Sequence, residues 1–79
     1  MHHDLVRGDQ QRHALLYIVR VAPIGGVQQN GTYLLKVKRK LEARGLIQRA
    51  PAIAGRPGYR WLPTPLGILV ATTLDDPIP

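Results

Sequence analysis

The side chains of this sequence that could do chemistry are cations gathered in one stretch. Residues 36–60 hold eight basic side chains and one acid, Glu42, whereas the other 54 residues hold three basic and four acidic ones. The formal net charge of +6 therefore arises from this stretch alone. Charge of one sign on a short segment favours a polyanionic partner, because solvated faces usually mix both signs. The cations are Lys36, Lys38, Arg39, Lys40, Arg44, Arg49, Arg56 and Arg60.

Catalytic and metal chemistry have little support in the residues. The chain has no cysteine, so it offers no thiolate and no disulfide. His2, His3 and His13 include an amino-terminal pattern that could chelate Cu(II), but they form no fixed tetrahedral set, and an adventitious site is the better interpretation. We find no nucleophile–base pair, no phosphate-binding glycine loop and no clustered carboxylates. We therefore predict no enzyme activity, no cofactor and no metal site.

Length and composition predict one small domain. The 79 residues are 44% hydrophobic, which is ordinary for a globular protein, and the core must be aliphatic because phenylalanine is absent. No apolar run approaches the roughly 20 residues that a membrane-spanning helix needs, and the polar N-terminus does not resemble a signal peptide. We expect a flexible N-terminus at residues 1–8, a single domain at residues 9–74 and a tail at residues 75–79.

One helix and a short connection are predicted before the basic stretch. Apolar residues recur at helical spacing over about residues 10–22, and Asp9 is a plausible N-cap. Pro23 should end this helix, because proline disfavours the α conformation in the residue before it. The glycine-rich residues 24–31 leave room for a single helical turn around Val27–Gln29.

The basic stretch itself begins with an amphipathic helix. We predict this helix over residues 32–44, with Thr32 as its N-cap and Gly45 as the left-handed residue that stops it. Apolar side chains at helical spacing should face the core, which leaves the basic side chains in solvent. The inward positions are Leu34, Val37 and Leu41, and the outward ones are Tyr33, Leu35, Lys36, Arg39 and Lys40.

A hairpin and a closing helix follow. Residues 46–62 are typical of two strands joined by a long loop rich in glycine and proline. Tyr59 and Trp61 on the second strand should cover the small core. Thr64 precedes a proline, a combination that favours a helix start, so we predict a helix over residues 65–74.

Two stretches resemble a known fold. LEARGLIQR at residues 41–49 is similar to the helix-to-strand junction of bacterial winged-helix regulators of the MarR-like and PadR-like groups. YRWLPTPLG at residues 59–67 looks like their return from the wing to the next helix, with Pro63 inserted. The resemblance implies an α+β winged helix-turn-helix domain with three helices, a two-stranded β-hairpin wing and a C-terminal helix. Residues 32–44 would be its recognition helix and residues 46–62 its wing, with a shortened helix at residues 24–31.

The resemblance also implies where DNA would bind. The leading end of a recognition helix meets base edges in the major groove, and an exposed wing arginine can reach the minor groove or a phosphate. The amides before the helix could pair with adenine, although turn chemistry around Asn30 explains them equally well. The candidate DNA-binding residues are Gln28, Gln29, Asn30, Thr32, Tyr33, Lys36, Arg39, Lys40, Arg49, Arg56 and Arg60.

These features predict a small basic protein that binds double-stranded DNA, most simply a cytoplasmic, nucleoid-associated transcription regulator. The oligomeric state stays open: a homodimer, as is common among such regulators, would be joined through helix 10–22 or helix 65–74. No membrane partner is expected. Two alternatives stay open. One is an excisionase-like architectural factor from a mobile element. The other is a winged-helix protein-interaction module or inhibitor that occupies an acidic or nucleic-acid-binding surface of a partner.

Overall fold

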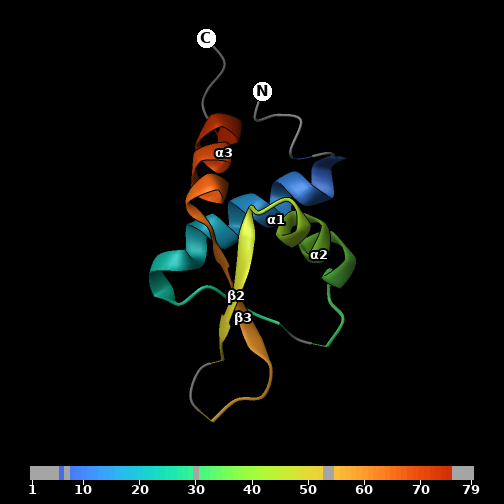
Figure 1. The fold of residues 1–79 in the computed structure, drawn as a ribbon, viewed down its shortest axis with the longest axis vertical. Helices are drawn as coiled ribbons and strands as arrows, with labels where there is room; N and C mark the ends of the chain where they lie inside the picture. Colours follow the sequence, from blue (N-terminus) through green and yellow to red (C-terminus); the bar gives the residue numbers. More distant parts are fainter. Residues whose placement is uncertain (1–5, 7, 30, 53–54, 76–79) are drawn as a thin grey trace.

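Three α-helices gather at one end of the molecule, and a β-hairpin reaches away from them (Figure 1). The computed structural model describes residues 6, 8–29, 31–52 and 55–75. Within these residues the fold is α+β, with three α-helices and a three-stranded antiparallel sheet, and it is compatible with a winged-helix-like arrangement. The elements are α1 (Gly8–Val21), the 3-10 helix η2 (Ala22–Ile24), β1 (Val27–Gln28), α2 (Leu35–Ala43), β2 (Ile47–Pro51), β3 (Tyr59–Pro63) and α3 (Pro65–Asp75).

The sheet has β3 at its centre, in the order β1-β3-β2. The hairpin strands pair from Ile47 opposite Pro63 to Pro51 opposite Tyr59, and β1 adds Val27 opposite Trp61. The predicted two-stranded hairpin at residues 46–62 is therefore confirmed, and the strand β1, which the sequence did not predict, pairs with it to make a three-stranded sheet. Residues opposite one another on paired strands share a face of the sheet, so β1 extends the face that carries Trp61.

The helical turn predicted around Val27–Gln29 is also wrong. The chain leaves α1 through the 3-10 helix η2, which contains Pro23, and then enters strand β1. Gly25 and Gly26, both with positive φ, separate the two elements. No α-helix stands between α1 and α2 in the described residues, so the shortened helix expected at residues 24–31 is replaced by a strand and a turn.

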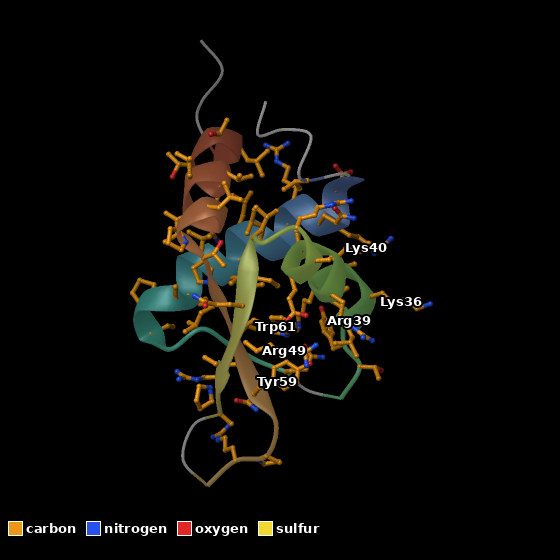
Figure 2. The ribbon with its side chains drawn as sticks, viewed as in Figure 1. Lys36, Arg39, Lys40, Arg49, Tyr59 and Trp61 are labelled. Atoms are coloured by element: carbon orange, nitrogen blue, oxygen red, sulfur yellow. The ribbon has the colours of Figure 1, made fainter. Side chains whose placement is uncertain are left out.

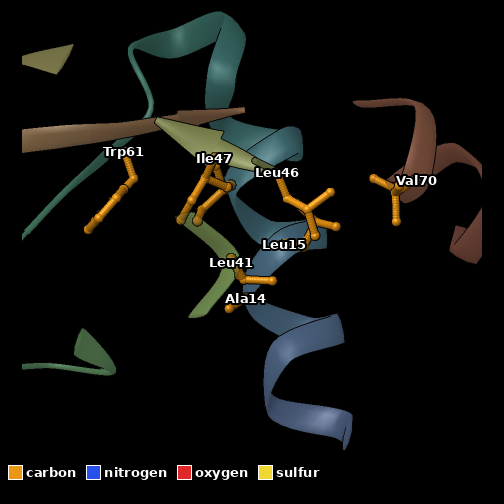
Figure 3. Close-up of a cluster of buried hydrophobic side chains, with 9 residues drawn as sticks. Ala14, Leu15, Leu41, Leu46, Ile47, Trp61 and Val70 are labelled. Atoms are coloured by element: carbon orange, nitrogen blue, oxygen red, sulfur yellow. The ribbon is translucent and has the colours of Figure 1, made fainter. Parts of the chain in front are cut away.

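The core is aliphatic apart from one indole, as the composition predicts. Trp61 from β3 is fully buried and belongs to one cluster with buried residues of α1, α2, β2 and α3 (Figure 3). Helix α1 contributes Ala14, Leu15 and Ile18, whose spacing places them on one side of the helix. The remaining buried apolar residues are Leu41, Leu46, Ile47, Val70 and Ala71.

The sequence predicts the end of α2 correctly and its start incorrectly. Gly45 has φ +76° and stops the helix as predicted, with Leu46 N–H donating to Leu41 C=O at 3.0 Å. The predicted start at Thr32 is wrong. Residue Leu34, with φ +51°, takes the N-cap position, and the Thr32 C=O accepts from Leu35 N–H across the turn before it. Thr32 thus shapes a turn instead of capping the helix.

Helix α1 begins two residues earlier than predicted, so Asp9 lies in its first turn and is not the N-cap. Helix α3 begins at Pro65, and Thr64 caps it as predicted, because its Oγ1 accepts from Gly67 N–H at 3.0 Å. The same hydroxyl donates to Gly45 C=O, which joins the start of α3 to the end of α2.

A glycine allows α3 to pack against the start of the hairpin. A Cβ added at Gly67 would lie 1.9 Å from the backbone oxygen of Leu46. Because that oxygen also accepts from Thr64 N–H at 3.1 Å, it cannot move away without breaking the cap region.

We expect Gly67→Ala to lower the free energy of unfolding by more than about 2 kcal/mol, because overpacking outweighs the better helix propensity of alanine. Urea unfolding followed by Trp61 fluorescence measures this. Thr72→Ala, at an exposed position of the same helix, is the control and should change the value by less than about 0.5 kcal/mol. Equal stability of Gly67→Ala and the parent protein would contradict this packing.

Candidate nucleic-acid interface

The outer face of α2 carries Lys36, Arg39 and Lys40. All three side chains are exposed, and among the described residues none makes a hydrogen bond or an ion pair (Figure 2). Tyr33, 62% exposed, lies in the turn just before the helix. The sequence predicted these four positions as outward, and the structure places them together on or beside one helix.

The start of α2 adds to the positive field. The N-cap residue Leu34 has a left-handed conformation and makes no side-chain capping bond, and no acid lies in the first turn. A helix N-terminus carries a partial positive charge and favours anions. Lys36 in the first turn therefore adds a full positive charge to an end of the helix whose first turn holds no acid.

Buried hydrogen bonds hold the inner face of α2 in place. They join Gln29, Lys38, Trp61 and the backbone of Tyr33, four residues that we call the Gln29 cluster. The Gln29 Oε1 accepts from Trp61 Nε1 at 2.9 Å and from Lys38 Nζ at 3.0 Å. Its Nε2 donates to the carbonyls of Gly31 at 3.0 Å and Tyr33 at 3.2 Å. The hydrogen-bonding capacity of this amide is thus used within the protein.

Gln29 was a candidate for base contact, and the structure gives it another role. Its side chain is only 9% exposed, and it joins β1, the turn before α2, helix α2 and strand β3. We therefore leave Gln29 out of the interface.

Lys38 is the residue that the sequence reasoning missed. It is 5% exposed, and its Nζ also donates to the Tyr33 carbonyl at 3.1 Å and lies 5.5 Å from the centre of the Tyr33 ring. Burial lowers the pKa of Lys38 below its ordinary value of 10.5. The signal was its spacing, because Lys38 lies three residues from both Leu35 and Leu41, which face the core.

Leu35 itself was expected on the outer face, and this is wrong. It packs against the core together with Val37. The helix begins at Leu35 and not at Thr32. The side of α2 that faces the core therefore includes Leu35, which the prediction had placed on the outer side.

Two predicted DNA contacts are arginines that brace the hairpin. The Arg49 guanidinium makes two hydrogen bonds to the Glu42 carboxylate, at 2.9 and 3.2 Å, which raises the pKa of Arg49. It lies 4.7 Å from the centre of the Tyr59 ring and 5.3 Å from that of Trp61 (Figure 2). Arg60 donates to the carbonyls of Pro51 at 2.7 Å and Gly25 at 2.9 Å.

The hairpin loop holds the remaining described candidates. Gln28 reaches it from β1, where its Nε2 donates to the Pro57 carbonyl at 2.8 Å. Arg56 is exposed beside Gly55 and makes no hydrogen bond or ion pair among the described residues. Asn30, like His2 and His3, lies outside the described residues.

Comparisons with protein families, with curated proteins and with solved structures gave no match for this chain. In the part of the chain that the structure describes, no helix is long and apolar enough to cross a membrane. The same residues hold no group of three histidine or acidic side chains placed to bind a metal ion.

The Gln29 cluster yields a stability prediction. Gln29→Ala leaves the Lys38 ammonium and the Trp61 indole N–H without their shared acceptor, so we expect a loss of about 2–4 kcal/mol in the free energy of unfolding. The control is Gln48→Ala, an exposed glutamine of β2 whose only side-chain bond in the described residues is 3.4 Å long. It should cost less than about 0.5 kcal/mol in the same urea titration. Similar losses in both variants would contradict the role of Gln29.

The buried ammonium predicts a pH dependence. Because the folded pKa of Lys38 is lowered, the unfolded chain binds more protons in the window just below pH 10.5, and stability should rise with pH there. We expect the parent protein to gain stability relative to Lys38→Met as the pH rises through this window. Thermal unfolding of both proteins at a series of pH values measures the difference, and a difference that stays constant or falls would count against a desolvated Lys38.

Proposed function

We propose that this chain is a winged-helix protein that binds duplex DNA, most simply a transcription regulator. One observation carries the proposal: the outer face of α2 presents exposed cations that have no hydrogen-bond or ion-pair partner among the described residues, while its inner face is held in the core. The order α1, β1, α2, β2, β3 supports it, since a basic helix followed by a hairpin is the arrangement of a recognition helix and its wing.

In this proposal α2 enters the major groove. A nine-residue helix is roughly 13 Å long and its width fits that groove. Lys36 and Arg39 would contact bases or phosphates, with Lys40 and Tyr33 beside them. The positive end of α2 would lie near the phosphate backbone.

The β2–β3 hairpin would act as the wing. Its loop lies at the far end of the molecule from α3, so Arg56 can reach a part of the duplex that α2 does not (Figure 1). Arg49 and Arg60 would stabilise the shape of the hairpin and add positive electrostatic potential to it. They would not contact DNA directly, since their donors already form hydrogen bonds with carboxylate and carbonyl groups of the protein.

The test is the double variant Lys36→Ala/Arg39→Ala in a gel-shift assay. It should lose duplex binding at about 100 mM salt, and the slope of log affinity against log salt should become shallower by about 2, from a parent slope near −5. The control Arg12→Ala/Arg20→Ala removes the same charge from exposed positions of α1 and should bind nearly as the parent does. Equal losses in both variants, or none, would overturn the assignment of α2.

We further propose that α3 joins two copies of the chain. It has no charged residue from Pro65 to Leu74, and the side chains Leu66, Ile68 and Leu69 are 36, 47 and 51% exposed although its other side packs in the core. A helix that is apolar on all sides is normally buried. An uncharged face suits a second copy, because the remaining surface of a chain with net charge +6 repels its own kind.

Light scattering after size exclusion tests this dimer. The parent protein should have twice the mass of one chain, and Ile68→Lys/Leu69→Lys should be monomeric, because two buried ammonium groups would face one another. Gln48→Lys on β2, the control, should stay dimeric. A monomeric parent protein at high concentration would contradict the dimer. It would also contradict recognition of two half-sites about one helical turn apart.

A second candidate function is a module that binds an acidic protein surface. The lack of an α-helix between α1 and α2 in the described residues favours it, since such a helix normally braces a recognition helix against the DNA backbone. Co-purification of one acidic partner, with no duplex binding by the parent protein at about 100 mM salt, would decide for this candidate. Loose binding with bending of the duplex would instead indicate an architectural factor.

A further inference from the structure

The loop of the β2–β3 hairpin is tied to strand β1 on the side that follows Arg56. The Gln28 side chain leaves β1, and its Nε2 donates to the Pro57 carbonyl at 2.8 Å. Gly58 lies against the same amide, since a Cβ added there would be 3.3 Å from Gln28 Nε2. The two residues that follow Arg56 are therefore both placed beside one side chain of β1.

The hairpin is tied to the same segment a second time, through Arg60 on β3. The Arg60 guanidinium donates from Nε to the Pro51 carbonyl at 2.7 Å and from Nη1 to the Gly25 carbonyl at 2.9 Å. Pro51 is the last residue of β2, and Gly25 lies between η2 and β1. Both strands that lead into the hairpin loop are thus joined to the segment around β1.

The Gln28 amide is poorly placed to read a base directly. A glutamine reads adenine with its amide oxygen and its amide nitrogen together. In Gln28 the nitrogen already donates to Pro57, and the oxygen Oε1 is buried without a hydrogen-bond partner among the described residues. Any contribution of Gln28 to DNA binding therefore passes through the loop that its nitrogen holds.

We propose that Gln28 is a positioning residue for DNA binding, which holds the hairpin loop so that Arg56 reaches the duplex beside α2. This inference rests on the proposed function, in which Arg56 contacts a part of the duplex that α2 does not. On the other side of Arg56, no described atom lies within 4 Å of a Cβ added at Gly55, so the Pro57 side is the anchored one. A loop that is held in place before DNA arrives loses less conformational entropy on binding.

A double-mutant cycle on DNA affinity tests this role. Fluorescence anisotropy, with a duplex that the parent protein selects from random DNA, measures the parent, Gln28→Met, Arg56→Ala and the double variant. Methionine is unbranched like glutamine and removes the donor to Pro57. Gln28→Met should weaken binding about three- to tenfold, the range of one ordinary hydrogen bond. In the Arg56→Ala background it should change the affinity less than about twofold, because no arginine is then left to position.

Two control variants and one measurement without DNA separate positioning from a general loss of structure. Combined with Lys36→Ala, Gln28→Met should keep its full effect, because Lys36 would contact the duplex from α2 and not from the loop. Gln48→Met, at an exposed glutamine of β2, should leave the affinity within about twofold of the parent. In the free protein, ¹⁵N relaxation should show larger motion at Gly55 and Gly58 in Gln28→Met than in the parent.

The outcomes distinguish this role from the proposed function. Additive losses from Gln28→Met and Arg56→Ala, or either variant binding as the parent does, would overturn the positioning role and leave the proposed function in place. A parent protein that binds no duplex would overturn the proposed function and the role of Gln28 with it. If Gln28→Met does not fold, Gly58→Ala replaces it, because its Cβ, at φ +91°, presses on the same amide from the loop side. Its loss should likewise vanish in the Arg56→Ala background, and an additive loss would contradict the role.

Discussion

The side-chain amide of Gln29 is the contact on which the arrangement of this protein depends. Its oxygen takes donors from Trp61 on the central strand and from Lys38 on α2, and its nitrogen donates to the turn between them. A buried polar group of this kind is costly when one partner is lost, so the four bonds hold strand, turn and helix in one geometry. They brace α2 from within, in a fold whose described residues hold no α-helix between α1 and α2.

This bracing divides cations that look alike in the sequence. Lys38, Arg49 and Arg60 use their donors on the protein itself, in the core, against Glu42 and on backbone carbonyls. Lys36, Arg39 and Lys40 stay exposed on the outer face of the helix that the first group holds in place. Some cations of the basic stretch therefore stabilise the fold, and others lie exposed on the surface. In the proposed function only the exposed cations contact a polyanion.

The sequence predicted well what local chemistry determines. Gly45 stops α2 because the chain needs a left-handed residue there, and Thr64 caps α3 through its own hydroxyl. It predicted poorly what distant residues determine. The two residues of β1 become a strand by pairing with β3, more than thirty residues away, and Lys38 is buried because Gln29 and Tyr33 supply its acceptors. Gln29 shows the same limit, since an amide before a basic helix is equally suited to adenine and to an internal bond.

In the proposed function, the outer face of α2 and the hairpin loop together form the surface that meets DNA. A ¹H–¹⁵N spectrum of the protein, recorded with a duplex selected from random DNA, tests it most directly. The shifts should be largest from Tyr33 to Lys40 and around Arg56, and small on the buried side of α1 at Leu15 and Ile18. Shifts centred on α1 or α3, with α2 unchanged, would contradict it.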